Sequence, residues 1–383
     1  MTRPIYMDHH ATTPVDARVL ERMLPFFRER FGNAASTHAQ GKDAKDAVAY
    51  ARAQTASLLG ADPAEIAFTS GATESDNLAI KGVMHALKAD KDHLVTLETE
   101  HKAVLDSARR LEREGFRVSY LPVDAEGRVD PEEVAAAIGP KTALVSVMLV
   151  NNETGTTQDL EAIGRVTRER EVWFHTDATQ GLGRVELDLD AMNIDLASFT
   201  AHKVHGPKGV GGLYVRRRDR RAPIVAEMDG GGHERGMRSG TLNVPGIVGL
   251  GEACQLLADE GQAERAQMSK LRDALRQRIE AADVGALLNG AEPPWRHPGN
   301  LNLSFEGADG SELLRRLAPV VAVSSGAACN SAHTEPSYVL RAMGMSSERA
   351  SSSLRFGIGR DNTMAEVERV AAAVVDAVRA ARA

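Results

Sequence analysis

One stretch of the chain reads Ser198-Phe199-Thr200-Ala201-His202-Lys203 and continues as Val204-His205-Gly206-Pro207-Lys208-Gly209. The apolar run before it predicts a strand over Leu196–Thr200, so Lys203 follows the end of a buried strand. A charged side chain is costly at such a position unless its amine takes part in a reaction. One such reaction is the formation of a Schiff base with a carbonyl group. A surface lysine in a Gly-rich turn is the alternative.

An acid follows a second predicted strand. Val172–Thr176 reads as a short apolar strand, and Asp177 comes directly after it, 26 residues before Lys203. Pyridoxal phosphate forms Schiff bases with lysines and needs a carboxylate against its ring nitrogen, which Asp177 would supply. Capping of a helix or turn by Asp177 is the alternative.

A Gly turn joins a third strand to a helix. The segment reads Phe68-Thr69-Ser70-Gly71-Ala72-Thr73-Glu74-Ser75, between a strand that ends at Thr69 and a helix expected over Thr73–Leu87. Small residues let the backbone approach a ligand, and the helix N-terminus offers free N–H groups. The segment therefore predicts a phosphate site, with a plain Ser/Thr N-cap as the alternative.

Length and charge limit the classes of function. The 383 residues are 43% hydrophobic, enough for two domains, and the net charge of −7 argues against binding nucleic acid through a broad basic field. The basic run Arg216–Arg221 follows a strand-like segment, so we expect a solvated hairpin turn, with a docking site for an acidic partner as the alternative.

Cysteine content and hydropathy indicate the compartment. Two cysteines, Cys254 and Cys329, are too few to staple a secreted fold. The first residues have no apolar h-region, and no apolar run approaches the ~18 residues of a membrane span. We expect a cytoplasmic protein without membrane contact.

Strands and helices alternate between about residues 64 and 215, which predicts an α/β fold with a mostly parallel sheet. Ligands of such sheets bind beyond the carboxyl ends of the strands, where several polar segments follow the predicted strands. These segments are Ser70–Thr73, Glu98–His101, Asn151–Glu153, Asp177–Gln180 and Thr200–Lys203. The predicted strands are Ile66–Thr69, Leu94–Leu97, Arg117–Leu121, Leu144–Leu149, Val172–Thr176 and Leu196–Thr200, and the predicted helices between them include Lys102–Glu114, Pro131–Ala137 and Asp159–Arg170.

The pattern changes after Thr241. A long helix is expected over Val244–Ala281, followed by a smaller α+β unit with strands near Asn300–Phe305 and Val320–Val323. Helices are expected over Glu312–Leu317, Pro336–Ala342 and Thr363–Arg382, with Pro336 at the first helical position. We predict a large domain over residues 16–247 and a small domain formed by residues 1–15 with 248–383.

The two cysteines have different settings. Cys329 lies among small and polar residues, in Val323-Ser324-Ser325-Gly326-Ala327-Ala328-Cys329-Asn330-Ser331-Ala332-His333-Thr334-Glu335-Pro336, which indicates an exposed thiol on a mobile loop. An incidental loop cysteine is the alternative. Cys254 lies in an amphipathic helical segment and is expected to serve packing only.

Motifs along nearly the whole chain carry a family resemblance. They are Asp8-His9-His10-Ala11-Thr12-Thr13-Pro14, Phe31-Gly32-Asn33, Thr69–Ser75, Thr99-Glu100-His101, Val150-Asn151-Asn152-Glu153, Asp177-Ala178-Thr179-Gln180, His202-Lys203, Gly230–Thr241, Ser324-Ser325-Gly326 with Cys329, and Arg355-Phe356. The chain resembles the class V aminotransferases, and within them the cysteine desulfurases that supply sulfur for iron–sulfur clusters. The resemblance implies fold type I, the pyridoxal-phosphate-dependent transferase fold, in a homodimer.

The resemblance also assigns roles to residues. Lys203 would form an imine with pyridoxal phosphate, while Asp177 would pair with the ring nitrogen. His101 would stack on the ring and transfer protons, and Gln180 would hydrogen-bond the ring hydroxyl. The residues implied around the phosphate are Ala72, Thr73, Thr200 and His202, with Thr241 from the other subunit, and the residues implied at the substrate carboxylate are Asn152 and Arg355.

The implied reaction converts L-cysteine to L-alanine. Cys329 would attack the substrate sulfur and carry it as a persulfide to an acceptor protein such as an iron–sulfur scaffold. A selenocysteine lyase, a small-molecule aminotransferase of the same fold and a non-catalytic, cofactor-bearing scaffold are the alternatives. No metal is predicted, because His9, His10, His101 and His202 lack any metal-binding spacing.

Overall fold

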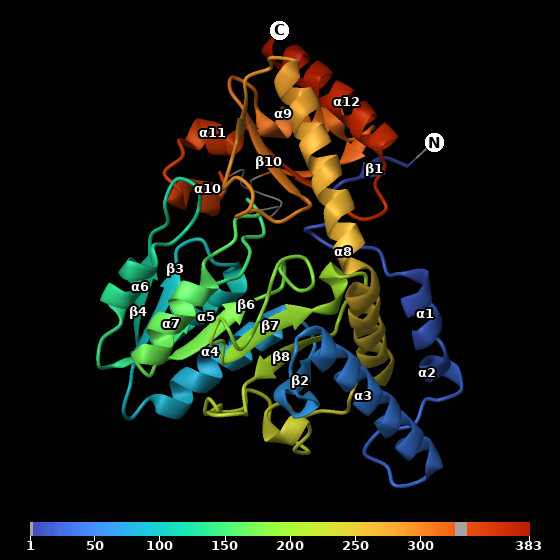
Figure 1. The fold of residues 1–383 in the computed structure, drawn as a ribbon, viewed down its shortest axis with the longest axis vertical. Coiled ribbons are helices and arrows are strands. Elements are labelled where there is room, and N and C mark those ends of the chain that lie inside the picture. The colour runs from blue at the N-terminus through green and yellow to red at the C-terminus, as the bar shows by residue number, and fades with distance from the viewer. Residues whose placement is uncertain (1–2, 326–334) are drawn as a thin grey trace.

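A seven-stranded sheet forms the centre of the larger lobe (Figure 1). Strand β8 runs antiparallel to both of its neighbours, whereas the pairs from β7 through β6, β5 and β3 to β4 are parallel. The predicted mostly parallel sheet is therefore confirmed. In spatial order the strands are β2 (Ile66–Thr69), β8 (Gly211–Val215), β7 (Leu196–Thr200), β6 (Trp173–Asp177), β5 (Thr142–Ser146), β3 (His93–Leu97) and β4 (Arg117–Leu121). The structure is a computed structural model that describes residues 3–325 and 335–383.

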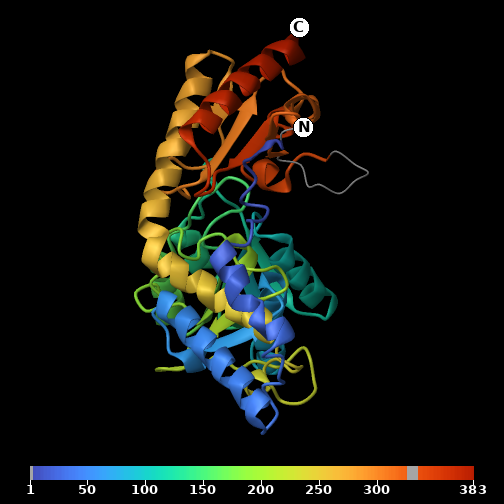
Figure 2. The ribbon, with the colours of Figure 1, turned by 90° about the vertical axis from the view of Figure 1, so that its right-hand side faces the viewer.

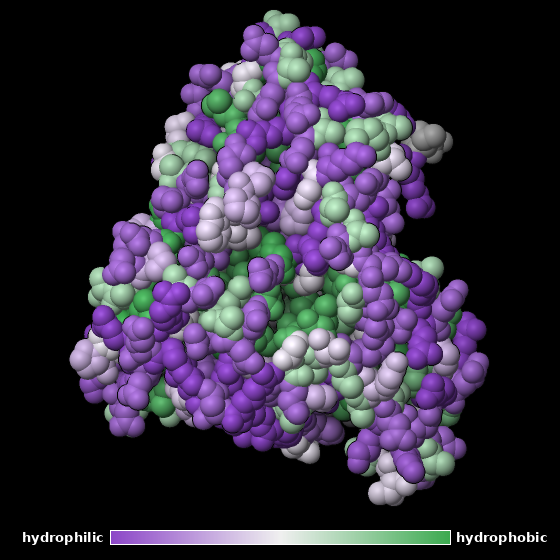
Figure 3. Space-filling view, in the orientation of Figure 1, coloured by the Kyte–Doolittle hydropathy of each residue, from purple (hydrophilic) through white to green (hydrophobic). Residues whose placement is uncertain are grey.

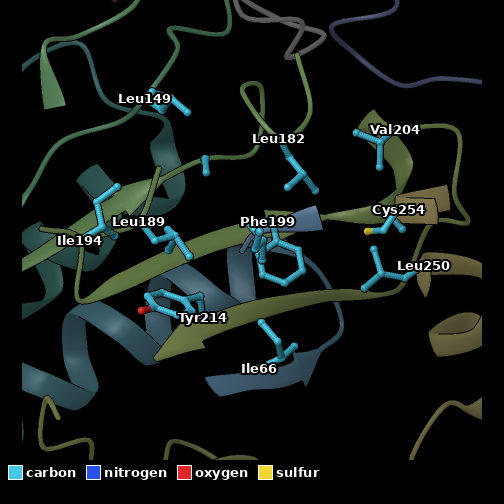
Figure 4. Close-up of a cluster of buried hydrophobic side chains, with 14 of the residues drawn as sticks. Ile66, Leu149, Leu182, Leu189, Ile194, Phe199, Val204, Tyr214, Leu250 and Cys254 are labelled. Carbon is cyan, nitrogen blue, oxygen red and sulfur yellow. The ribbon is translucent and has the colours of Figure 1, made fainter. Parts of the chain in front are cut away.

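Helices cover both faces of this sheet. One buried cluster joins the sheet to α4 (Ala72–Leu87) and α5 (Lys102–Arg113). A second cluster, partly drawn in Figure 4, joins the other face to α3 (Ala39–Leu58), α7 (Leu160–Glu169) and the first half of α8 (Val244–Ala281). Helix α6 (Pro131–Ala137) contributes Val134 to that cluster.

Cys254 belongs to this second cluster. Figure 4 shows its side chain near Leu250, and it is fully buried. Burial raises the pKa of its thiol to about 12, so the thiol stays protonated near neutral pH. The expected packing environment of Cys254 is therefore confirmed.

The smaller lobe contains a four-stranded antiparallel sheet in the order β12-β13-β10-β9. Its core joins the second half of α8 to the C-terminal helices. The N-terminal strand β1 pairs in parallel with β11, so the chain begins beside this lobe. The elements are β1 (Ile5–Tyr6), β9 (Ala286–Leu288), β10 (Asn300–Phe305), α9 (Gly310–Leu317), β11 (Val321–Ala322), β12 (Ser324–Ser325), α10 (Tyr338–Ala342), α11 (Ser347–Ser351), β13 (Ser353–Gly357) and α12 (Met364–Arg382).

Helix α8 links the two lobes. In Figures 1 and 2 it runs from beside the large sheet up to the smaller lobe. The predicted domain boundary at residues 247 and 248 would fall inside this continuous helix, and that division stays a prediction. The short helices α1 (Ala17–Met23) and α2 (Pro25–Arg28) pack beside α8 in the larger lobe.

Several predicted element boundaries differ from the structure, and two of these differences have a clear cause. The strand expected over Leu144–Leu149 ends at Ser146. The apolar run continues past this end because Val147 and Leu149 pack in the second cluster and Met148 lines a cavity. Helix α10 does not begin at Pro336. The Ser337 side chain accepts a hydrogen bond from the Leu340 N–H at 3.2 Å, so Ser337 is the N-cap.

The basic run is not a solvated turn throughout. Arg216 is 6% exposed and donates to the carbonyl oxygen of Leu189 at 2.7 Å. Arg220 donates through Nε to Oδ1 of the buried Asp195, also at 2.7 Å. The prediction fails because acids in the segment before β7 form ion pairs with these arginines.

Among the described residues, no helix combines the length and apolar character that a membrane crossing requires.

Candidate active site

A cavity of about 570 Å³ lies beyond the carboxyl ends of the parallel strands. On the face seen in Figure 3, hydrophobic residues gather near the middle of the molecule, between the two lobes, within a mostly hydrophilic surface. The predicted convergence of strand ends is confirmed, because residues that follow β2, β3, β5, β6 and β7 all line this cavity. The predicted site residues among them are Ala72, Thr73, His101, Asn152, Asp177, Gln180, Thr200, His202, Lys203 and Arg355.

Lys203 ends the short 3-10 turn that follows β7 directly. Its Nζ donates to the carbonyl oxygens of His10 and of Ala11, the latter at 2.8 Å. Burial, together with the positive charge of Arg355, lowers the pKa of Lys203 to about 8, and the nearby Asp8 carboxylate opposes the shift. An appreciable share of the amine is therefore unprotonated near neutral pH, as a nucleophile or a base requires.

Asp177 ends β6 and is 4% exposed. Its Oδ1 accepts the N–H of Thr179 at 2.9 Å. Two further buried carboxyl groups lie nearby: burial and the negative charge of Asp177 raise the pKa of Asp76 and of Glu100 well above the usual range. Burial therefore keeps both of these neighbours neutral near pH 7, and Asp177 contributes its carboxyl group directly to the cavity wall.

The turn after β2 exposes backbone N–H groups to the cavity. Gly71 has a φ of 151°, a conformation that favours glycine, and it precedes the first turn of α4. Among the described residues, no side chain caps this helix start, so the Ser/Thr N-cap alternative does not hold. Thr200 and His202 line the cavity beside this turn, which makes the arrangement suitable for an anion.

His101 has a structural contact that the sequence did not indicate. It is the N-cap of α5, and its Nδ1 accepts the N–H of Ala103 at 3.2 Å. In the neutral imidazole the proton is therefore on Nε2. The backbone thus fixes the ring orientation and leaves Nε2 available for proton transfer.

Arg355 and Asn152 meet at the cavity wall. Arg355 Nη1 donates to the carbonyl oxygen of Asn152 at 2.8 Å, and Nη2 donates to Asp8 Oδ1 at 2.8 Å. Within residues 3–325 and 335–383, Arg355 Nε and Asn152 Oδ1 are buried and lack hydrogen-bond partners. Buried polar groups are rarely left unsatisfied, so this pair is suited to a polar ligand.

Gln180 is held by His10. Gln180 Nε2 donates to the carbonyl oxygen of His10 at 2.9 Å, and His10 Nδ1 lies 3.0 Å from Gln180 Oε1. Sequence reasoning gave no site role to Asp8 or His10, because their partners lie 347 and 170 residues away. The available signal was the polar run Asp8-His9-His10, which begins two residues after the end of the short strand β1.

Two predicted site residues lie apart from this arrangement. Thr241 is exposed and does not line the cavity, and its role in the cavity of a second subunit stays a prediction. Cys329 lies outside the described residues. In the part of the chain that the structure describes, no cluster of His, Cys, Asp and Glu is placed to hold a metal ion.

A family profile described as Aminotransferase class-V matches residues 5–370. The chain belongs to the class-V aminotransferase family. Within this family it groups with the cysteine desulfurases. It is 56% identical over 369 residues to the cysteine desulfurase IscS of Anaeromyxobacter dehalogenans, covering 96% of this chain and 91% of that protein.

Two solved structures have a fold similar to that of this chain. A NifS-like protein superposes with a TM-score of 0.90 at 38% identity, covering 97% of this chain and 98% of the other. A structure of SspA in complex with cysteine superposes with a TM-score of 0.83 at 37% identity, covering 94% and 100%. The predicted fold type I architecture is therefore confirmed.

Proposed function

We propose that this chain is a cysteine desulfurase that converts L-cysteine to L-alanine and carries the sulfur as a persulfide on Cys329. One observation carries the proposal: Lys203 and Asp177 line the same cavity as the incompletely bonded pair Arg355 and Asn152. An amine, an acid and a carboxylate-binding wall are what amino-acid chemistry on a carbonyl cofactor requires. The 56% identity to a protein named cysteine desulfurase IscS supports the choice of reaction.

The cavity fits pyridoxal phosphate. Asp177 would pair with the ring nitrogen, Gln180 with the ring hydroxyl, and the uncapped start of α4 with the phosphate. The donors at that helix start and the buried Nε and Oδ1 atoms of Arg355 and Asn152 match a ligand that is anionic at one end and carries an amino acid at the other. When bound, the cofactor supplies an electron sink for bonds broken at the substrate Cα.

The chain's own residues would then divide the work. Lys203, with its pKa lowered to about 8, would take and return the proton at the substrate Cα. Arg355 and Asn152 would orient the substrate carboxylate through the edge of the guanidinium that the protein leaves open. His101 would stack on the ring and transfer protons through Nε2.

The sulfur step balances without an added oxidant. The Cys329 thiolate attacks the substrate sulfur, the carbon–sulfur bond breaks, and its electron pair remains on the substrate carbon. A proton then completes L-alanine, while the transferred sulfur atom becomes the outer atom of the Cys329 persulfide. A thiol acceptor takes this atom in the next step.

The partners are part of the same proposal. A homodimer would bring Thr241 to the phosphate of the other subunit, and the exposed rings of Phe27 and Phe31 give the chain apolar surface to bury in such a contact. An iron–sulfur scaffold or a similar protein would accept the sulfur. A cytoplasmic location also belongs to the proposal, in line with the two cysteines of the sequence.

The two cysteines offer a matched test. The purified protein is given L-cysteine, alanine is measured, and persulfide is located by mass spectrometry in the wild type, Cys329→Ala and Cys254→Ala. We expect Cys329→Ala to lose alanine formation and Cys254→Ala to keep it, because Cys254 is buried with a raised thiol pKa. Full turnover by Cys329→Ala would instead favour a selenocysteine lyase or an aminotransferase.

A further inference from the structure

We propose that Asp8 is a positioning residue that holds the Arg355 guanidinium in the orientation that receives the substrate carboxylate. The inference rests on the proposed function, since it assigns how that substrate is held. It starts from the ion pair between Arg355 Nη2 and Asp8 Oδ1, at 2.8 Å, on the cavity wall.

The backbone fixes where the Asp8 carboxylate lies. Residues 7 to 9 run beside the end of β13: the Gly357 N–H donates to the Met7 carbonyl oxygen at 2.7 Å, and the His9 N–H donates to the Gly357 carbonyl oxygen at 3.1 Å. Asp8 forms an isolated parallel bridge with Gly357, two residues after Arg355. The main-chain hydrogen bonds of Met7 and His9 with Gly357 therefore hold the Asp8 carboxylate close to the Arg355 guanidinium.

The hydrogen bonds of Arg355 leave one edge of its guanidinium open. Nη2 donates to Asp8 and Nη1 to the Asn152 carbonyl oxygen, while Nε has no partner in the described chain and is buried. A planar guanidinium has fixed donor directions, so anchoring Nη1 and Nη2 fixes the direction of the Nε edge. A carboxylate that accepts from Nε would complete a buried donor that the protein alone leaves unsatisfied.

Asp8 also balances charge at the amine. The side chains of Arg355 and Asp8 are 11% and 19% exposed, so solvent screens them only in part. Arg355 lowers the pKa of Lys203, whereas Asp8 and Asp177 raise it. Two further titratable side chains that interact with the amine, His10 and His202, have lowered pKa values and are neutral near pH 7. Removal of the Asp8 charge should therefore lower the pKa of Lys203 further, because less negative charge then offsets the charge of Arg355.

A purely structural role is the competing account, in which Asp8 only ties the N-terminal segment to β13. That role predicts a loss of thermal stability with unchanged substrate binding. A positioning role predicts weaker binding of amino acids and a shifted titration at the cofactor. The two accounts therefore differ in measurements that do not depend on stability.

The test uses the holoenzyme of the wild type, Asp8→Asn, Asp8→Glu and a control, Asp43→Asn, which loses an acid paired with Arg30 on the exposed surface. For each protein, kcat and KM for L-cysteine are measured. The visible band of the bound cofactor then gives two further readouts: the L-alanine concentration that half-saturates its change, and its pH midpoint. The L-alanine readout needs no sulfur chemistry, so it stays informative if the proposed function fails.

We expect Asp8→Asn to raise KM and the L-alanine half-saturation by about tenfold, the scale of one charge-assisted hydrogen bond, with a smaller change in kcat. Its pH midpoint should fall, because an anion near the amine is gone. Asp8→Glu should recover much of the loss, and Asp43→Asn should match the wild type.

Two results would overturn the proposal. One is an L-alanine half-saturation within twofold of wild type in Asp8→Asn. The other is an Asp8→Glu variant as weak as Asp8→Asn, since the charge would then be irrelevant. If Asp8→Asn does not fold, Asp8→Glu decides alone, and a half-saturation more than tenfold above wild type contradicts the proposal. A wild type that binds L-alanine but forms none from L-cysteine would remove the proposed function and leave the positioning role standing.

Discussion

Two arginines five residues apart, Arg355 and Arg360, form similar ion pairs but differ in whether all their buried donors have hydrogen-bond partners. Each pairs with an acid of the N-terminal segment, Arg355 with Asp8 and Arg360 with Asp16. Arg360 also donates to Glu264 Oε1 at 3.0 Å, and the second oxygen of Glu264 accepts from Arg184. Arg355 instead retains a buried Nε without a partner among the described residues.

The difference distinguishes a binding wall from a structural link. The cluster of Asp16, Arg184, Glu264 and Arg360, which we term the saturated cluster, joins α8 to both lobes through complementary charges. Its contribution should be to stability. Arg355 lies on the cavity wall with an open donor, so its contribution should be to ligand binding. Substitutions at Lys203, in the saturated cluster and at Arg355 separate these two kinds of effect.

Lys203→Ala should cause the largest change in activity. We expect alanine formation to fall by about 10³-fold or more, because a positioned group that transfers protons contributes on that scale. Thermal stability should not fall with it, since burial of the Lys203 charge is itself unfavourable. Initial rates and thermal unfolding of the same preparations check both. A variant that loses stability and activity together would show that Lys203, like the saturated cluster, contributes to the stability of the fold.

Arg355→Lys should weaken substrate binding by about 100-fold, because an ammonium cannot keep the two anchored donors and the open edge of a guanidinium at once, and small misplacements are costly. The expected change is mainly in KM for L-cysteine. Steady-state kinetics check it, with Arg276→Lys as a control at an exposed ion pair with Glu280 and Glu292. An unchanged KM would show that the open Nε is not a substrate contact.

Glu264→Gln should destabilise the fold rather than the reaction. It leaves the Arg184 and Arg360 charges close together and poorly balanced, and breaking a buried pair commonly costs about 3 kcal/mol. We expect kcat/KM of the folded protein to stay within a few-fold of wild type. Denaturant unfolding gives the free energy of unfolding, and Glu280→Gln, in an exposed pair, should cost less than about 1 kcal/mol. A large loss of kcat/KM with normal stability would show that the saturated cluster contributes to the reaction rather than to stability.

The smallest effect is a pH dependence of stability. The pKa of Lys203 is about 8 in the folded state and 10.5 in an exposed lysine, so the unfolded chain binds more protons between these values. Stability conferred by this site therefore rises with pH through that window, and the full penalty is present below pH 8. In the cofactor-free protein, Lys203→Met should be more stable than wild type at pH 7, with an advantage that shrinks towards pH 10.5. An advantage independent of pH would show that the amine is not buried in solution.

Sequence patterns predicted those features of the site that depend on residues close together in the chain. The strand ends at Thr69, Asp177 and Thr200 follow from apolar runs followed by polar residues, and they place most of the cavity wall. The contacts of Asp8 and His10 were not predictable in this way, because they join segments at opposite ends of the chain. The misplaced end of β5 has another cause. Met148 and Val150 are apolar and line the cavity, and Val147 and Leu149 pack in a buried cluster, and an apolar run alone does not distinguish these roles from a strand.

The central claim is that the cavity around Lys203 and Arg355 removes sulfur from L-cysteine, and product analysis tests it most directly. The purified wild-type protein is mixed with L-cysteine and a thiol reductant, and alanine, sulfide and keto acids are measured over time. The account predicts alanine and sulfide in equal amounts. Pyruvate or another keto acid in place of alanine would contradict it.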